Sequence, residues 1–389
     1  MIKVNRKIDI EPGFDMGLIA PPERLIFFDI ETTGLKAGQS SLYLIGTVDF
    51  HEGLWWLSQF FAEDPSEEPA LLSAFSDIIS EKKKGQDHVI LVSFNGDTFD
   101  IPYIREVERQ YGKPSSFRDT VSLDLLKEIR PFKKLTGLPN LRLKTVEKLF
   151  GVMREDVYSG GELIYVYEEY LRLSHILKGG CEDTELNEAL RNKCLDCLLL
   201  HNAEDIADMP LCMGILSYRL LKDGEFTLRK AEVTKDPVSG GEIYDAVFSL
   251  KAPLPKGVYY EDENFVLSVS EDGSSLMEVT ARLVNTEMRY YFQDFKNYYY
   301  LPFEDYAIHK SVGEFVDRKN RRQATAQTCY TKKEGLFIPE PEPVFTPVFY
   351  RTYKGMKYAE FCEEMLKDTG KIKEYVLSVL DMSINAGYN

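Results

Sequence analysis

Runs of apolar residues separated by turn signals divide the first part of the chain into strands and helices. Three runs rich in aromatic and β-branched residues predict strands at about 25–32, 42–50 and 54–61. The pattern then predicts a helix, a strand, a second helix and a short strand, at about 69–84, 88–94, 99–111 and 117–122. Helical spacing continues to about residue 222, with a kink expected at Pro210. This order predicts an α/β domain.

At Asp223-Gly224 the sequence pattern changes from helical spacing to alternating, β-like segments. We therefore expect one domain at 1–222 and an α+β accessory domain at 223–389. In the second part the alternation of apolar and polar residues predicts strands at 244–250, 265–269 and 277–284, with a hairpin turn at 271–274. An aromatic-dense stretch at 289–300 precedes an expected helix at 304–316, and a final helical segment is expected at 357–384.

Asp29 and Glu31 are the most informative pair in the chain. They lie two positions apart in the apolar run 25–32, so their side chains should point to the same face of a strand. Two buried carboxylates are unfavourable unless their charge is compensated, and oxygen ligands suit Mg²⁺ or Mn²⁺. The alternative is that Asp29 merely ends the strand and Glu31 is solvated.

Two later segments contribute further acidic residues, Asp100 first and then Asp205 with His201. Asp100 follows the strand predicted at 88–94, at or just inside a helix start. An acid there is commonly a helix cap, although Asp97 is the better candidate for that duty. His201 and Asp205 lie four positions apart on one face of a strongly helical segment, where a contact that only stabilises the helix is the alternative.

The ordered set Asp-x-Glu, Asp and His-x-x-x-Asp resembles the DEDD exonuclease superfamily, and within it the YprB-type ribonuclease-H-like family of bacterial proteins. The resemblance covers about residues 22–222. Three further segments support it: Ser122–Leu126, Leu141–Gly151 and Gly160–Tyr170.

The resemblance implies a ribonuclease-H-like mixed sheet flanked by helices and a 3′–5′ exonuclease that acts on DNA or RNA, releasing nucleoside monophosphates. It also implies two bound Mg²⁺ or Mn²⁺ ions, with single strands or 3′ ends as the expected substrate. The expected metal ligands are Asp29, Glu31, Asp100 and Asp205, and His201 would orient or deprotonate the attacking water. Thr32 and Asn95, in the turns beside these acids, are expected to contact nucleic acid.

One departure concerns His201. In one DEDD branch the last motif is Tyr-x-x-x-Asp, and in the other a His precedes the Asp by five residues. Here the spacing is that of the Tyr branch but the residue is His. A shift of one position turns a side chain by about 100° around a helix, so the spacing leaves the role of His201 open.

The chain carries a formal net charge of −16, which is unusual for a nucleic-acid-binding protein. Binding would therefore depend on local positive patches. Residues 307–335 carry seven Lys or Arg against three acids, including Arg318, Lys319, Arg321 and Arg322. Basic residues beside aromatic ones suit single-stranded nucleic acid; the alternative is that the tyrosines belong to a sheet core and the charges decorate a solvated helix end.

Cysteine use and hydropathy predict a cytoplasmic protein without membrane association, because neither a disulfide framework nor a signal or transmembrane segment is evident. Cys194, Cys197 and His201 share one helix face, and Cys181 would be the fourth ligand of a zinc site. Small thiols in the core are the favoured interpretation. A non-catalytic nucleic-acid-binding protein and a scaffold that recruits a protein partner remain alternatives to the nuclease.

Overall fold

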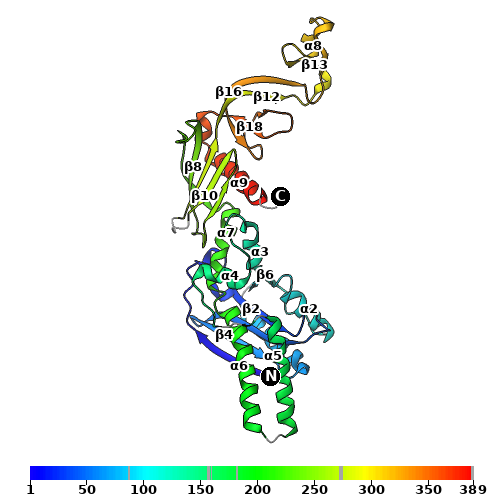
Figure 1. Cartoon of the computed structure of the whole chain (residues 1–389), viewed down its shortest axis with the longest axis vertical. Helices are drawn as coiled ribbons and strands as arrows, with labels where there is room; N and C mark the ends of the chain where they lie inside the picture. The colour runs from blue at the N-terminus through cyan, green and yellow to red at the C-terminus, as the bar shows by residue number, and fades with distance from the viewer. Residues whose placement is uncertain (86–87, 156–157, 159, 181–182, 271–274, 387–389) are drawn as a thin grey trace. The chain divides into compact units, whose positions relative to one another are not determined.

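The computed structural model describes residues 1–85, 88–155, 158, 160–180, 183–270 and 275–386. The chain divides into two compact units (Figure 1). The first unit comprises residues 1–130 and 138–216, and the second comprises residues 131–137 and 217–389. Among the described residues, no helix is both long enough and apolar enough to cross a bilayer.

The first unit is built on a six-stranded mixed sheet with the strand order β1-β4-β3-β2-β5-β6. The strands β1 to β4 pair antiparallel, whereas β5 runs parallel to β2 and β6 parallel to β5. Their bounds are Ile2–Ile8, Leu25–Thr32, Leu42–His51, Leu54–Phe61, Val89–Ser93 and Thr120–Asp124. The helices are α1 (Glu68–Lys83), α2 (Asp100–Gln110), α3 (Leu125–Ile129), α4 (Leu143–Glu147), α5 (Gly160–Gly179) and α6 (Thr184–Ala207). The α/β fold with a mixed sheet flanked by helices is thus confirmed.

Three details of the first unit differ from the sequence prediction. Strand β1 is an additional edge strand, paired with β4. Strand β6 lies at 120–124 and not at 117–122. Near Pro210 the helix ends instead of kinking, since α6 stops at Ala207 and the chain continues as a 3₁₀ helix (Leu211–Ile215) and α7 (Leu216–Lys222).

The second unit is rich in strands. It contains a five-stranded sheet (order β7-β8-β11-β10-β9), a closed barrel (β12-β16-β18-β17) and a three-stranded sheet (β14-β13-β15). The strands β7 to β12 are Phe226–Lys235, Glu242–Leu250, Val258–Glu261, Phe265–Val269, Leu276–Arg282 and Val284–Tyr291. The strands β13 to β18 are Tyr298–Leu301, Tyr306–His309, Arg322–Gln323, Tyr330–Glu340, Val348–Tyr350 and Lys357–Glu360. Helix α9 (Thr369–Asn385) packs beside β10 and β16 (Figure 1).

Two helix predictions in the second unit are wrong in part. Of the helix expected at 304–316, only α8 (Lys310–Gly313) forms, because residues 306–309 pair with β13 as β14. The final segment begins as β18, and its helix starts only at Thr369. The hairpin turn predicted at 271–274 lies outside the described residues, although β10 and β11 on either side of it pair antiparallel.

Helix α6 lies directly on the sheet and contacts β2, β3 and β4. Gly46, which pairs with Asp29 across β2 and β3, makes this close approach possible. A Cβ atom at position 46 would lie 2.1 Å from Asn202 Oδ1 and 2.5 Å from Ile206 Cδ1. Leu198 and Ile206 on α6 are fully buried. The absence of a side chain at Gly46 therefore sets the distance between α6 and the acids of β2.

We expect Gly46→Ala to lower the free energy of unfolding by about 1–3 kcal/mol, because an added methyl group must displace Asn202 and Ile206. Urea denaturation followed by circular dichroism measures this loss. Gly161→Ala is the matched control, since nothing lies within 4 Å of the added Cβ there. Equal stability of the two variants would contradict this account of the helix packing.

Candidate active site

The acid pair of β2 faces α6. The side-chain amide of Asn202 donates to Asp29 Oδ2 over 3.2 Å, and His201 Nε2 lies 3.6 Å from Glu31 Oε1. Both carboxylates therefore meet the same helix, which confirms that the two-residue spacing places them on one face. Asn202 is itself held by Gln59 of β4, whose side-chain nitrogen donates to Asn202 Oδ1 over 2.9 Å.

Asp100 is the first residue of α2 and joins the acid pair through the backbone of β2. Its side chain is buried, and its Oδ1 accepts a hydrogen bond from the backbone N–H of Ile30 over 3.2 Å. Asp97 does not cap α2, because Phe99 occupies the N-cap position. The Asp97 carboxylate instead accepts from Ser122 and Lys127, both over 2.5 Å.

His201 lies between two carboxylates, with its Nε2 atom 3.4 Å from Asp205 Oδ2 as well as near Glu31. Only 5% of the residue is exposed. One ligand atom from each of Glu31, His201 and Asp205 falls within 4.8 Å of the others, a spacing that could hold a metal ion. His201 thus points into the acid cluster although its spacing is that of the Tyr branch.

The cluster carries more negative charge than its surroundings neutralise. Burial, reinforced by Asp100, Asp205 and Glu31, holds the pKa of Asp29 well above its usual value, and the hydrogen bond from Asn202 only partly opposes this. Burial also raises the pKa of Asp100 to about 7, even though two backbone N–H groups donate to its carboxylate. Divalent cations with oxygen ligands would relieve this excess charge, so the side chains present fit such ions.

A buried arginine that the sequence did not reveal braces Asp205. Arg154 donates from Nε and Nη2 to the two carboxylate oxygens of Glu147, each over 2.6 Å. Its Nη1 donates to Asp205 Oδ1. Because Oδ1 is taken by the arginine, Oδ2 is the oxygen that faces His201. Glu147 falls within the family-like segment Leu141–Gly151, but no local pattern identifies Arg154 as its partner.

Thr32 and Asn95 shape the turns beside the acids. Thr32 Oγ1 donates to the carbonyl oxygen of Gly34 over 2.8 Å. Asn95 adopts a positive φ of 74°, and its backbone N–H donates to Asp124 Oδ1 over 2.8 Å. Both residues thus have structural duties, and their predicted contacts with nucleic acid remain a prediction.

The basic run at 318–322 lies in the second unit, and its side chains differ in how far their charge is exposed. Arg321 packs over the ring of Tyr299, 4.6 Å from its centroid, and donates to the carbonyl oxygen of Gly313. Arg318, Lys319 and Arg322 are exposed. Arg321 is therefore engaged in holding the fold, whereas the other three leave their charge at the surface.

The cysteines of α6 pack with the core. Cys194 and Cys197 lie against the main hydrophobic cluster of the first unit, and burial raises the pKa of Cys194. Cys181, the fourth ligand of the zinc hypothesis, lies outside the described residues. The described thiols therefore fit the interpretation as core side chains.

A cleft of about 340 Å³ lies on the first unit, and some of its lining residues neighbour the acids in the sequence. Thr98 and Phe99, which immediately precede Asp100, form one wall, and Leu35 and Lys36, which follow the end of β2, form another. Leu35 is 85% exposed. The cleft therefore offers apolar surface, and its charged lining residues are Lys36 and Glu106.

Comparison with known proteins defines the class of the first unit. Residues 26–216 match the model of the RNase_H superfamily. Together with the six-stranded mixed sheet flanked by helices, this match shows that the first unit contains a ribonuclease-H-like domain. The narrower DEDD and YprB-type assignments stay predictions.

Two individual proteins are also similar. A DNA polymerase of Desulfurococcus sp. (strain Tok) is 27% identical over 202 residues, covering 44% of this chain and 25% of the polymerase. This chain thus spans a quarter of that relative's length. The structure of the family B DNA polymerase from the hyperthermophilic archaeon Pyrobaculum calidifontis aligns with a TM-score of 0.31 at 16% identity, over 69% of this chain and 34% of that one.

Replacing Arg154 with Met should lower the free energy of unfolding by about 3 kcal/mol or more, because Glu147 would be left buried without its partner. Thermal or urea denaturation measures this change. The double variant Glu147→Leu/Arg154→Met should recover part of the loss. Arg109→Met removes an exposed Glu106–Arg109 pair and should change little. A loss as small as in that control would show that the buried pair is unimportant.

Without metal at pH 8, Asp29→Asn should raise the unfolding temperature, because it removes a charge whose pKa the fold has raised. This advantage should shrink as pH falls, since wild-type Asp29 then takes up a proton in the folded state before it does so in the unfolded chain. Millimolar Mn²⁺ should stabilise the wild type by several degrees and leave Asp29→Asn unchanged. Differential scanning fluorimetry tests both effects.

Asp77→Asn, at an exposed position on α1, is the matched control and should retain the response to Mn²⁺. A wild type that does not respond to Mn²⁺ or Mg²⁺ would argue against a metal site.

Proposed function

We propose that the protein is a nuclease, a 3′–5′ exonuclease that hydrolyses phosphodiester bonds of DNA or RNA with the help of two Mg²⁺ or Mn²⁺ ions. The observation that carries the proposal is the convergence of Asp29, Glu31, Asp100, Asp205 and His201 within a ribonuclease-H-like domain. The direction of cleavage rests on the resemblance to DEDD exonucleases.

The four carboxylates would hold the ions, which supply an activated water and neutralise charge that develops on the phosphate. Asp29 and Glu31 are fixed by the strand, and Asp100 is fixed by the N–H of Ile30. Asp205 is oriented by Arg154, so that its Oδ2 stays directed at the cluster. Asp29, Asp100 and Asp205 thus each have a second contact that limits rotation of the side chain.

His201 would orient the attacking water and accept its proton at Nε2 as the water oxygen bonds to phosphorus. The bond from phosphorus to the 3′ oxygen of the preceding nucleotide then breaks, that oxygen keeps the electron pair and takes a proton from solvent water, and a nucleoside 5′-monophosphate leaves. His201 is suited to this role because it lies between Glu31 and Asp205, which would limit the orientations of its ring.

Nucleic acid would reach the site through local contacts. Lys36 and exposed Leu35, in the cleft that Thr98 and Phe99 also line, are proposed to offer a charge and an apolar surface for a terminal nucleotide. Thr32 and Asn95 border the same acids. In the second unit, exposed Arg318, Lys319 and Arg322 are proposed to contact phosphates, while Arg321 contributes by shaping that surface.

Incubation of end-labelled single-stranded DNA and RNA with Mn²⁺ or Mg²⁺ tests the proposal. The wild type should shorten a 5′-labelled strand progressively from its 3′ end, and Asp29→Asn should show no cleavage. His201→Gln should lower the rate by about 10²–10⁴-fold while the stabilisation by Mn²⁺ persists.

Asp77→Asn should cleave like the wild type and controls for a trace contaminant. If the wild type binds Mn²⁺ but degrades neither strand, the non-catalytic binding protein is the better account. Cleavage that survives Asp29→Asn would mean that the acids are not the active site.

A further inference from the structure

The second unit contains a cleft of about 820 Å³ walled by aromatic rings, which we call the aromatic cleft. Its volume falls in the range of roughly 300–1,000 Å³ that is usual for ligand sites. The lining residues come from the end of β12 and the turn after it, from β17 and the turns around it, and from Ala326. The aromatic members are Tyr290, Tyr291, Phe292, Phe295, Tyr350 and Tyr353.

These rings hold one another in place. Tyr291 meets Tyr353 and Tyr350 edge to face, with centroids 5.3 Å and 5.7 Å apart. Phe292 stacks on Tyr298 at 4.6 Å with an interplanar angle of 13°. Each of these rings is only half-buried. Because neighbouring rings already fix the walls, a flat ligand could stack there with little further ordering of side chains.

Positive charge accompanies the rings. Among the described residues that line the cleft, Lys354 is the sole charged one, and it is exposed. Arg351 is exposed in the same turn. Exposed Arg322 adjoins Gln323, whose side-chain nitrogen donates to the carbonyl oxygen of Phe295 over 3.1 Å. The basic run at 318–322 is therefore tied to a wall of the cleft, so a ligand with a flat ring and a negative charge is favoured.

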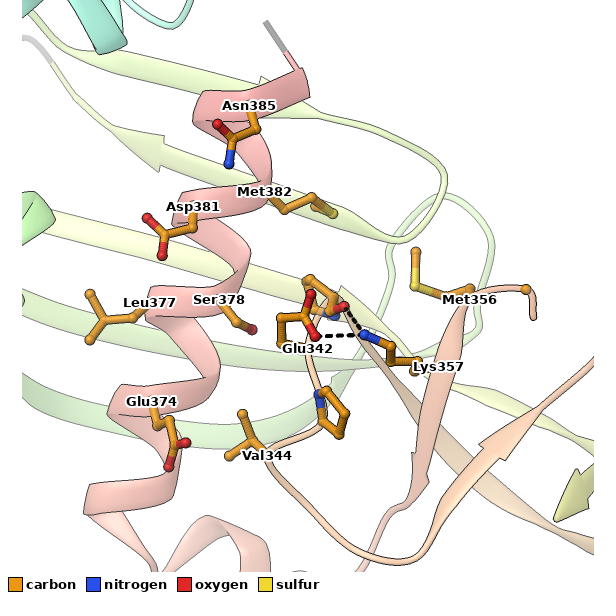
Figure 2. Close-up of a pocket in the computed structure, with 13 residues that line it drawn as sticks. Glu342, Val344, Met356, Lys357, Glu374, Leu377, Ser378, Asp381, Met382 and Asn385 are labelled. Atoms are coloured by element: carbon orange, nitrogen blue, oxygen red, sulfur yellow. Dashed lines mark hydrogen bonds and ion pairs between the residues drawn. The ribbon is translucent and has the colours of Figure 1, made fainter. Parts of the chain in front are cut away.

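A second groove on the same unit has no aromatic ring in its described lining and more acidic than basic side chains (Figure 2). It has a volume of about 570 Å³ and lies along α9, where Glu374, Asp381 and Met382 contribute to its lining. Glu342 there pairs with Lys357 over 2.6 Å. The described lining includes no aromatic ring, and its acids would repel a phosphate. This groove therefore provides a control position outside the aromatic cleft.

We propose that the aromatic cleft binds an unpaired nucleobase of single-stranded nucleic acid, with Tyr353 stacking on the base and Lys354 contacting its phosphate. Stacking on aromatic side chains combined with phosphate contacts is how single strands are bound without sequence preference. This inference rests on the proposed function in one respect: the nuclease activity makes the bound strand a substrate.

Fluorescence anisotropy with labelled oligothymidylate and oligouridylate tests the cleft, using the full chain with Asp29→Asn so that no strand is cut. Adding Tyr353→Ala should raise the Kd about tenfold, whereas Tyr353→Trp should keep it within about twofold because the indole still stacks. Lys354→Glu should weaken binding and reduce its dependence on salt. Met382→Ala, in the groove of Figure 2, should leave the Kd unchanged. The two oligonucleotides distinguish DNA from RNA as the source of the base.

Unchanged binding in both Tyr353→Ala and Lys354→Glu would overturn the proposal, as would an equal loss in Met382→Ala. Proline-rich peptides also bind aromatic surfaces. If the cleft binds such a peptide instead, oligonucleotide binding should be unchanged in both Tyr353→Ala and Lys354→Glu. If the chain with intact Asp29 cuts no strand but binding still depends on Tyr353, the nuclease proposal fails and the cleft stands. If the chain with intact Asp29 cleaves the strand but Tyr353→Ala does not change binding, the nuclease proposal stands and the proposal for the cleft fails.

Discussion

Helix α6 can lie against β3 only because Gly46 leaves room for Asn202 and Ile206, whose side chains occupy the space a Cβ atom would need. That contact brings the side chains of two successive helical turns to the acids of the sheet. Asn202 reaches Asp29, His201 reaches Glu31, and Asp205 lies one turn further along the helix beside His201. The geometry of the acid cluster is therefore a consequence of how closely one helix packs on one strand pair.

The same packing creates an electrostatic problem that the fold solves only in part. Burying Asp29 and Asp100 beside other carboxylates raises the pKa of both. Arg154 is the cation that the described structure brings to the cluster, yet it shares its charge with buried Glu147. A site with surplus negative charge and restrained ligands is a poor structural element but a suitable one for binding divalent cations. The unfavourable burial of these carboxylates thus supports a functional interpretation of the cluster over a purely structural one.

Local patterns were enough to predict part of this arrangement. Continuous apolar runs predicted β2, β3 and β4, and short spacings placed Asp29 with Glu31 and His201 with Asp205. Arg154 could not be predicted, because its partner Asp205 is 51 positions away and only tertiary packing joins them. Polar alternation in the edge strand β1 concealed it. At 304–316, pairing of β14 with β13 overrode a helical pattern, since strand pairing depends on distant residues that no local window contains.

For the proposed function, an acidic chain must keep its excess negative charge away from the surfaces that contact phosphates. The acids of the cluster would be neutralised by bound cations, so they need not repel a strand once the site is loaded. Exposed cations in the second unit gather near rings, where stacking contributes attraction that does not depend on charge. A net charge of −16 therefore argues against a broad basic groove but not against a small number of well-placed contacts.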